Sequence, residues 1–305
     1  TWVAMKNISY KFRVVTNCDM CKSDSSNFKL LGRRMNRSQG LSPRNKVALI
    51  TSIEKCKKCG LIFSNPQPIP LNIEDHYGMD PVEYWQEDYF KPNVNGNKAI
   101  IEKAILYGGK NGKILDIGIG IGLGMKAMLD VGLDVIGVEP SAEFRNYAIS
   151  KTGIPGERIV LSPIENAKFP EDHFDYINMG AVLEHLADPS DSIKLALQWL
   201  KPGGKIEIEV PNAEWMVGKL FNLYYFLTLQ PYVANISPMH PPFHLFEFNL
   251  KSFQLNGEIS KYKIIHHHYF VGPTYLPAIF NRLMNKIMKI TNTGMQLIVV
   301  LEKPR

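Results

Sequence analysis

The four cysteines of the chain fall into two pairs with the spacing of metal ligands. Cys18 and Cys21 form one Cys-x-x-Cys pair, Cys56 and Cys59 form the other, and 34 residues separate the pairs. Two residues between thiolates let both sulfurs turn toward one ion, so two such pairs can supply the tetrahedral S4 coordination of structural zinc. Gly60 follows the second pair, where a tight turn needs it. We therefore predict a structural Zn²⁺ site, with two redox pairs or reduced buried cysteines as alternatives.

Basic residues surround these cysteines. Lysines flank both pairs, and we expect their charge to favour the thiolate over the thiol: Lys22, Lys55, Lys57 and Lys58. The segment 33–40 between the pairs carries Arg33, Arg34 and Arg37. It is either a solvated loop that offsets the charge of a zinc–thiolate centre or a loop that contacts phosphates.

Two acidic residues and three glycines mark a second candidate site. Asp116 stands two residues before the first glycine of Gly118-x-Gly120-x-Gly122. Glycines let the backbone approach a ligand, and the N-terminus of a following helix offers free N–H groups. Asp116 would repel a pyrophosphate but suits an ammonium group, and Glu139, at the tip of the next expected strand, can accept hydrogen bonds from both ribose hydroxyls. The combination fits S-adenosylmethionine better than NAD.

The same region resembles a known family. Residues 114–122 resemble motif I of class I S-adenosylmethionine-dependent methyltransferases, and residues 135–141 are similar to their second motif. Residues 174–186 look like the fourth strand and its helix, and residues 200–204 look like the turn before strand five. The resemblance covers roughly residues 98–212. It implies an α/β fold with a Rossmann-like, seven-stranded methyltransferase sheet.

The resemblance also assigns roles to single residues. In the family, the acid of strand one and the loop glycines hold the amino-acid part of the cofactor, a role that falls here on Asp116 and the three glycines. The acid of strand two holds the ribose, which implicates Glu139. Many members carry an Asp after strand three that accepts from the adenine amino group, but Pro163 stands at that place here. We expect adenine to use the backbone N–H of Ile164 and the side chain of Glu165 instead.

The front of the chain resembles a group that joins an N-terminal zinc-binding module to this fold. Residues 56–68 carry that resemblance, and residues 242–248 resemble the Pro-x-His-Leu-x-x-Phe segment that follows strand five in the group. Several members act on sugars or other small biosynthetic intermediates, and some are sugar C-methyltransferases. We expect a zinc-ribbon-like module at 1–70, an aromatic connector at 71–97 and a methyltransferase domain at 98–305, with a substrate-capping insertion near 212–250.

Three histidines are candidates for the catalytic base. Methyl transfer is an in-line displacement at a sulfonium, for which a protein aligns the nucleophile and removes its proton. Histidine suits that role near neutral pH. His185 follows strand four, where the fold places residues beside the methyl group, and His240 and His244 lie in the expected cap. Packing against the cofactor is the alternative for His185, and Glu247 is an alternative partner.

Strands and helices must alternate to position these residues. The apolar runs predict strands at 113–117, 134–138, 158–161, 174–179, 205–210, 263–270 and 295–301. Helical spacing favours helices at 98–106, 123–131, 141–150 and 189–200. This alternation indicates a parallel sheet with helices on both faces.

Two apolar segments stand apart from that pattern. Residues 220–229 are aromatic and uncharged but too short to span a bilayer, so they form a lid over an apolar or lipid-linked substrate or pack as core. Residues 276–289 place apolar side chains at helical spacing, with Arg282, Lys286 and Lys289 on the other side. That helix docks on the domain or on a dimer partner, or it lies on an anionic membrane surface.

Composition and charge bound the remaining choices. The 305 residues are 45% hydrophobic and 21% charged, which is typical of a globular protein. We find no apolar stretch of about 18 residues, and residues 1–15 lack the apolar run of a secretory signal, so we expect a cytoplasmic protein without a transmembrane segment. Residues 1–60 hold 13 Lys+Arg and 3 Asp+Glu, whereas residues 61–305 hold 22 Lys+Arg and 26 Asp+Glu, so the excess positive charge lies at the front of the chain. A local anionic group on the substrate would suit this basic front.

The sequence therefore predicts a zinc-containing, S-adenosylmethionine-dependent methyltransferase of small-molecule substrates. We expect a sugar-linked substrate that is phosphate-bearing or lipid-linked. An RNA methyltransferase whose basic zinc module grips phosphates is the second interpretation, although nucleic acid is the less favoured partner. A catalytically silent zinc-binding adaptor that keeps the fold is the third.

Overall fold

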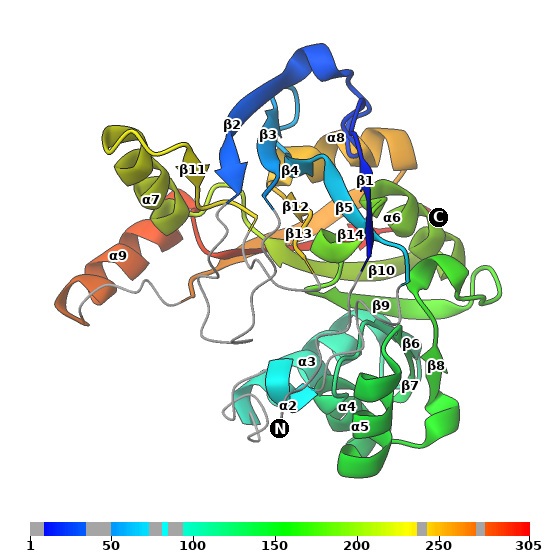
Figure 1. Ribbon diagram of the computed structural model, residues 1–305. Helices are drawn as coiled ribbons and strands as arrows, with labels where there is room; N and C mark the ends of the chain where they lie inside the picture. Colours follow the sequence, from blue (N-terminus) through cyan, green and yellow to red (C-terminus); the bar gives the residue numbers. More distant parts are fainter. Residues whose placement is uncertain (1–8, 35–49, 73–80, 85–93, 237–242, 273–277) are drawn as a thin grey trace, which may run out of the picture.

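The computed structural model describes residues 9–34, 50–72, 81–84, 94–236, 243–272 and 278–305. A seven-stranded sheet lies at its centre, in the order β13-β14-β10-β9-β6-β7-β8 (Figure 1). Its strands are β6 (Lys113–Ile117), β7 (Asp134–Glu139), β8 (Ile159–Leu161), β9 (Phe174–Gly180), β10 (Leu200–Pro211), β13 (Lys263–Phe270) and β14 (Gln296–Glu302). Within this sheet β14 runs against both neighbours and the other strands are parallel. The predicted seven-stranded α/β sheet is confirmed.

Helices cover both faces of this sheet. One layer holds α3 (Val94–Gly108), α4 (Leu123–Asp130) and α5 (Ala142–Thr152), and the other holds α6 (Pro189–Trp199) and α8 (Leu250–Ser260) (Figure 1). A short helix, α2 (Pro81–Tyr84), contacts α5. Because both faces are covered, the central strands are apolar along nearly their whole length; in β6 every residue after Lys113 is buried.

The front of the chain forms a second, smaller sheet. Strands β2 (Phe28–Arg34), β3 (Ser52–Cys56) and β4 (Ile62–Asn65) pair antiparallel, and β1 (Tyr10–Arg13) pairs with β5 (Gln67–Pro70). Two strands from the expected insertion, β11 (Tyr232–Val233) and β12 (Phe246–Glu247), extend the three to the order β11-β2-β3-β4-β12. The division near residue 70 remains a prediction, but strands from its two sides pair with each other.

The cysteine module and the central sheet share one core. The largest cluster of buried apolar side chains contains all four cysteines and Phe63 together with Ile177 and Ile208 of the central sheet. Polar contacts also cross the boundary. Asp19 accepts from the backbone N–H of Ser190 at 2.6 Å, and Asn256 donates to the carbonyl of Met20 at 3.1 Å. The module is therefore packed onto the larger part, not tethered to it by a free linker.

Two helices, α7 (Met216–Leu227) and α9 (Ala278–Thr291), lie on the left of Figure 1, away from these layers. The alternative that residues 220–229 pack as core is wrong, because seven of their apolar side chains are 41% to 92% exposed: Leu220, Phe221, Leu223, Tyr224, Phe226, Leu227 and Leu229. Among the helices described, none is both long and apolar enough to cross a bilayer.

Candidate functional site

The candidate site lies at the carboxyl ends of β6, β7 and β9. In an open α/β sheet, ligands bind at this edge, where the connecting loops meet. Asp116 on β6 stands opposite Gly137 on β7 and opposite Asn178 on β9. The loop after β6, the tip of β7 and the loop after β9 therefore lie next to one another.

The loop after β6 depends on its glycines. Gly118, Gly120 and Gly122 have φ values of 74°, 56° and 80°, a left-handed conformation that other residues adopt only at a cost. A Cβ atom on Gly118 would lie 2.4 Å from Cγ2 of Val182, and one on Gly122 would lie 2.6 Å from Cδ1 of Ile154. No side chain caps the start of α4, so its first N–H groups face the ligand edge.

Two buried carboxyl groups flank this loop. Asp116 and Glu139 are each 5% exposed. Asn178 donates from Nδ2 to Oδ1 of Asp116 at 2.7 Å, and Glu139 accepts from the backbone N–H groups of Gly120 at 2.8 Å and Ser141 at 3.0 Å. Burial raises the pKa of Asp116 to about 6 and that of Glu139 to about 7, although these hydrogen bonds oppose the rise.

The donor set of this edge fits S-adenosylmethionine. No lysine or arginine in the described part of the chain forms an ion pair with Asp116 or Glu139, so two buried acids share one edge without a cation of the protein. A ligand with an ammonium group, a sulfonium and ribose hydroxyls would satisfy them. Sequence reasoning missed Asn178, which holds Asp116 in place; only the strand order reveals that the two residues are neighbours.

Two of the predicted histidines come together beside this loop. His185 lies in the short 3-10 helix Leu183–His185 after β9, and its ring centroid is 4.8 Å from that of His244. Nδ1 of His185 lies 3.1 Å from the carbonyl oxygen of Phe243. The backbone N–H of Leu245 donates to the carbonyl of Glu184 at 2.7 Å, which fixes the two segments against each other. His240 lies outside the described residues.

Glu184 completes the cluster, and sequence reasoning missed it as well. Ligand atoms of Glu184, His185 and His244 all lie within 4.8 Å of one another. Glu184 is 1% exposed, its Oε2 has no hydrogen-bond partner in the described structure, and burial raises its pKa to about 8. Such a group can move a proton or hold a cation. Val182, which touches Gly118, ties the cluster to the glycine loop.

Three other predicted site residues have different surroundings. Glu247 is buried, but it accepts from the side chain of Asn235 and the backbone N–H of Ile236, and no hydrogen bond recorded for it in the described residues reaches a histidine. The side chain of Ile164 belongs to the main core, and Glu165 is exposed. No described hydrogen bond joins Glu165 to either buried acid, so its role toward adenine stays a prediction.

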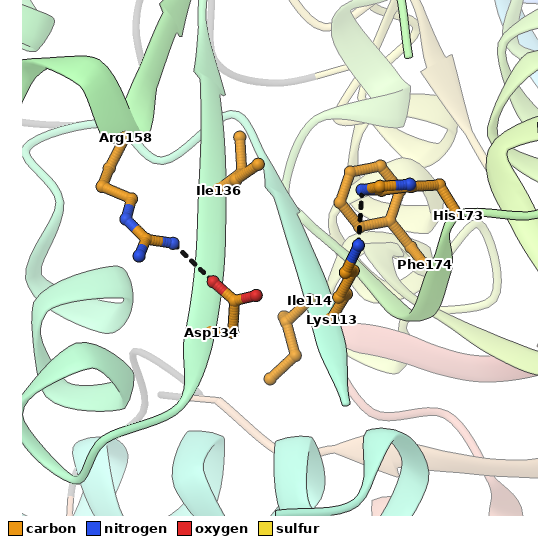
Figure 2. Close-up of a pocket in the computed structure, with 7 residues that line it drawn as sticks. All are labelled: Lys113, Ile114, Asp134, Ile136, Arg158, His173 and Phe174. Carbon is orange, nitrogen blue, oxygen red and sulfur yellow. Dashed lines mark hydrogen bonds and ion pairs between the residues drawn. The ribbon is translucent and has the colours of Figure 1, made fainter. Parts of the chain in front are cut away.

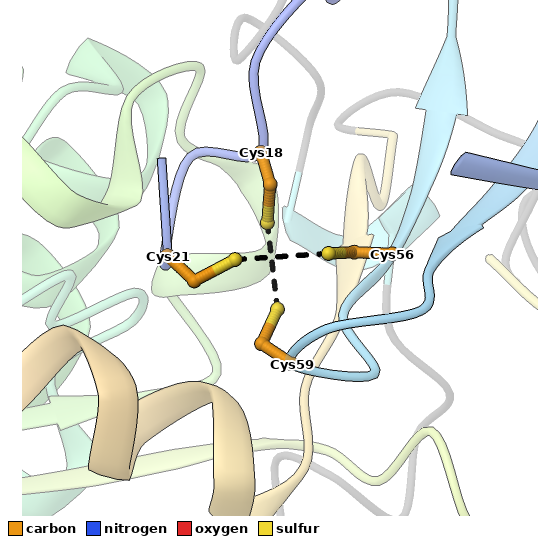
Figure 3. Close-up of side chains that lie close together, drawn as sticks. All are labelled: Cys18, Cys21, Cys56 and Cys59. Atoms are coloured by element: carbon orange, nitrogen blue, oxygen red, sulfur yellow. Dashed lines mark hydrogen bonds between the residues drawn. The ribbon is translucent and has the colours of Figure 1, made fainter. Parts of the chain in front are cut away.

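The four cysteines converge on one point (Figure 3). Sγ of Cys18 lies 3.4 Å from that of Cys59, and Sγ of Cys21 lies 3.7 Å from that of Cys56. Each of the four residues is 6% exposed or less. A tetrahedral zinc ion with Zn–S bonds of about 2.3 Å needs sulfurs about 3.8 Å apart, so the donor set and its spacing fit zinc.

Hydrogen bonds, not lysines, stabilise the Cys56 thiolate. Burial raises the pKa of this thiol, but hydrogen bonds from the Ser23 hydroxyl and from backbone N–H groups outweigh burial and lower the pKa to about 7. Three of the four lysines that were expected to help are engaged elsewhere. Lys22 pairs with Asp19, Lys55 with Glu214, and Lys57 donates to the carbonyl of Ser26.

Arg34 points into the protein. It was predicted in a solvated or phosphate-contacting loop, but it is 1% exposed and its guanidinium lies 5.0 Å from the ring centroid of Phe243. Burial lowers its pKa to about 9, while the nearby carboxyl of Glu247 opposes that change. Arg34 therefore joins the front module to the segment that carries His244. Arg37 lies outside the described residues.

A cavity of about 290 Å³ opens at the opposite edge of the sheet (Figure 2). It is lined at the amino ends of the strands by Lys113, Ile114, Asp134, Ile136, Arg158, His173 and Phe174. Arg158 forms an ion pair with Asp134 in this cavity, and Nζ of Lys113 lies within hydrogen-bond distance of Nε2 of His173. Ligands of such sheets bind at the other edge, so this cavity is not the candidate site.

Comparisons with known proteins bear on the same region. Residues 87–253 match a family described as a methyltransferase domain. The uncharacterized protein MJ1123 of Methanocaldococcus jannaschii is 27% identical over 154 residues, covering 50% of this chain and 67% of that protein. A ubiquinone biosynthesis O-methyltransferase of Aliivibrio fischeri is 32% identical over 138 residues, covering 42% and 58%. The chain thus spans about half the length of that named relative.

A solved structure supports the fold. Phosphoethanolamine N-methyltransferase 2 of Haemonchus contortus, in complex with phosphomonomethylethanolamine and S-adenosylhomocysteine, superposes with a TM-score of 0.51 at 17% identity. The superposition covers 80% of this chain and 64% of that one. The matched family segment, residues 87–253, is more than half of the chain and contains the glycine loop, both buried acids and the Glu184 cluster. The chain therefore belongs to the methyltransferase domain family.

Proposed function

We propose that this protein transfers a methyl group from S-adenosylmethionine to a small biosynthetic substrate, and that the substrate is sugar-linked. The observation that carries the proposal is the pairing of two buried acids around the glycine loop with the Glu184, His185 and His244 cluster beside that loop. The named small-molecule O-methyltransferases among the relatives support a small acceptor. The sugar rests on the resemblance of the cysteine module and of residues 242–248.

The acids would bind the cofactor. When bound, S-adenosylmethionine supplies an electrophilic methyl group on a positively charged sulfur. Asp116 would accept from the ammonium group, and the amide of Asn178 would keep that carboxylate in place. Glu139 already holds the loop through Gly120 and has lone pairs left for the ribose hydroxyls. The positive φ of the glycines would let the backbone lie against the ligand.

The histidine cluster would take the proton of the acceptor. The carbonyl of Phe243 can only accept a hydrogen bond, so Nδ1 of His185 carries the proton and Nε2 keeps its lone pair. Nε2 would remove the acceptor proton as the acceptor attacks the methyl carbon and the carbon–sulfur bond breaks. Glu184 lies within 4.8 Å and has a pKa raised to about 8 by burial, and in its ionised form it would stabilise the positive charge that forms on the imidazole.

We propose further that the four cysteines hold one structural Zn²⁺. Their sulfur spacing and their burial support this assignment. A closed S4 site has no open position for a substrate, so the ion would stabilise the fold without taking part in the chemistry.

The other two interpretations receive less support. An RNA methyltransferase would need the arginines of the basic loop on the surface; Arg33 is exposed, but Arg34 is 1% exposed and faces the interior. A silent adaptor would have no use for two buried acids that cost stability, or for a buried carboxyl beside two histidines.

Calorimetry with S-adenosylmethionine tests the cofactor half of the proposal. We expect binding to the parent protein and to the surface variant Asp130→Asn, and a loss of about 100-fold for Asp116→Asn. Incubation with nucleotide sugars, sugar phosphates and phenols, read by mass spectrometry, tests the acceptor. His185→Gln should keep cofactor affinity and lose turnover by about 100-fold or more. Absence of cofactor binding by the parent protein would refute the proposal.

A further inference from the structure

The outer face of α7 is apolar and uncovered. Its buried side consists of Val217 and Gly218, and Asn222 fixes it by accepting from the backbone N–H of Ala234 at 2.7 Å. The opposite side carries Leu220, Leu223 and Leu227, one and two turns apart and 46% to 69% exposed. Phe226 is 74% exposed, and Leu229, just after the helix, is 92% exposed.

Helix α9 shows three stripes along its length. One stripe packs on the protein and contains the buried Met288 and the half-buried Met284. A second stripe is apolar and exposed, with Phe280, Leu283, Ile287 and Ile290 at 37% to 72%. Between them on the solvent side runs a basic stripe, Arg282, Lys286 and Lys289, all exposed. The sequence predicted that Leu283 and Ile287 belong to the apolar face that docks, but in the structure both side chains are exposed to solvent.

The two helices meet at one end, and we call their exposed apolar and basic faces together the α7/α9 surface. The backbone N–H of Met216, at the start of α7, donates to the carbonyl of Thr293, just after α9, at 3.1 Å. Both helices therefore leave the protein from one corner and lie on the same side in Figure 1. That corner follows the carboxyl end of β10, at the same edge of the sheet as the glycine loop.

The α7/α9 surface carries only positive charge. Residues 216–229 and 278–291 contain no Asp or Glu. Lys219 is neutralised by an ion pair with Glu214. Arg282, Lys286 and Lys289 form no ion pair with any residue that the structure describes. Three unpaired cations thus border an apolar stripe.

We propose that the α7/α9 surface docks on an anionic lipid membrane. Exposed leucines and phenylalanines of this size enter the boundary between headgroups and acyl chains, while lysine and arginine beside them meet lipid phosphates. A second copy of the chain fits less well, because a two-fold interface would bring the same three cations against each other. The inference does not depend on the proposed enzymatic activity.

Vesicle flotation of the full chain tests this docking. We expect the parent protein to float with phosphatidylcholine vesicles that contain about a third phosphatidylglycerol, and to bind pure phosphatidylcholine vesicles about tenfold more weakly. Lys286→Glu with Lys289→Glu, and separately Leu283→Ser with Ile287→Ser, should each weaken binding to the anionic vesicles by about tenfold or more. Added salt should weaken the parent in the same direction.

A matched control separates the surface from net charge. Lys110→Glu with Lys151→Glu makes the same change in charge at exposed positions outside the α7/α9 surface, and should leave vesicle binding within about twofold. Circular dichroism and cofactor calorimetry should be unchanged in all variants, since these side chains are exposed. Equal binding to both vesicle types, equal loss in the control, or a dimer in light scattering that only Leu283→Ser with Ile287→Ser dissolves would overturn the proposal.

Discussion

The glycine-loop edge and the cysteine module solve the problem of positioning a ligand in opposite ways. At the glycine-loop edge, the backbone register between β6 and β9 fixes Asp116 and Asn178. The buried acids lower stability when they are ionised, unless a cationic ligand pairs with them. In the module, β3 and β4 are only five and four residues long, and β11 and β12 from a distant part of the chain complete their sheet. The glycine-loop edge is folded without its ligand. In the cysteine module, the proposed metal ion would itself help to stabilise the fold.

The largest effect that tests this contrast is loss of the cysteine centre. Cys56→Ser with Cys59→Ser, or a chelator, would remove two or all of the sulfur–metal bonds of the proposed zinc site, and structural zinc contributes on the order of 10 kcal/mol in small modules. We expect the module to become open to proteolysis between β2 and β5 and the melting transition to fall or split. Limited proteolysis with mass spectrometry and calorimetric melting measure this.

The control for that experiment is Ser26→Ala, an exposed residue within the module, which should change the free energy of unfolding by about 0.5 kcal/mol or less. If the chelator changes neither proteolysis nor melting while metal analysis shows no zinc in the purified protein, the module is held by packing alone. The contrast between the two regions would then disappear.

The second effect, at the glycine-loop edge, separates affinity from stability. Asp116→Asn keeps the hydrogen bond from Asn178 but removes the charge, so affinity for S-adenosylmethionine should fall by about 100-fold. The pKa of Asp116 is raised to about 6 in the folded chain. Protonated Asp116 therefore stabilises the fold fully at pH values below the pKa of an ordinary Asp, and this stabilisation is lost as pH rises through about 6. Above pH 6 the free energy of unfolding of Asp116→Asn should therefore exceed that of the parent protein by about 2 kcal/mol.

Lower cofactor affinity together with higher stability in Asp116→Asn would distinguish a role in binding from a general loss of structure. Calorimetric titration gives the affinity, and denaturant unfolding at about pH 7.5 gives the stability. Asp130→Asn, whose carboxylate pairs with Lys126 on the surface, should alter neither by more than a small amount. A less stable Asp116→Asn protein would mean that the acid holds the fold and not a ligand.

The contrast between the regions also explains what the sequence could predict. Around Asp116 the signals are local, because alternating strands and helices and a glycine run each occupy a few consecutive residues. Both acids could therefore be found before the fold was known. Asn178 and Glu184 escaped because nothing local marks them: Asn178 matters only since β9 pairs with β6, and Glu184 only since residues 243–245 fold back over it.

In the front of the chain the local signals were misleading. Arg34 lies in a run of basic residues that is typical of a solvated loop, yet the partners that bury it, Phe243 and Glu247, are about 210 residues away in sequence. The lysines near the cysteines gave the same false impression, because closeness in sequence does not decide which carboxylate or carbonyl a long side chain reaches. Contacts with residues distant in the sequence determine where Arg34 lies, and contacts that the sequence does not reveal determine which groups the lysines reach.

A third, smaller effect compares two glycines with the same backbone. Gly118 and Gly132 have φ values of 74° and 82°, but a Cβ on Gly118 meets Val182 at 2.4 Å whereas one on Gly132 meets nothing within 4 Å. Gly132→Ala should cost about 1 kcal/mol of left-handed strain. Gly118→Ala should cost about 2–3 kcal/mol, because a steric clash is added, and should also weaken cofactor binding.

The difference between these two variants isolates the contact between the glycine loop and the segment that carries Glu184. Urea unfolding measures both costs, and Gly118→Ala combined with Val182→Ala should recover part of the loss. Equal costs for Gly118→Ala and Gly132→Ala would show that the loop and Val182 are not packed together. The link between cofactor loop and proton-transfer cluster would then be broken.

The last effect is the pH dependence of cofactor affinity. Burial raises the pKa of Glu139 to about 7 and that of Asp116 to about 6, and both must lose a proton to bind an ammonium group and ribose hydroxyls as carboxylates. Affinity should therefore rise with pH between about 5 and 8, by up to about tenfold per unit for each proton released, and level off above that range. The free energy of unfolding of the ligand-free protein should instead fall as pH rises, because each raised pKa favours the folded state at low pH.

Titrations in buffers with different ionisation heats count the protons released on binding. In Asp116→Asn the lower part of the rise should disappear while the part near pH 7 remains, and an affinity that is flat from about pH 5 to 8 in the parent would mean that neither acid titrates on binding.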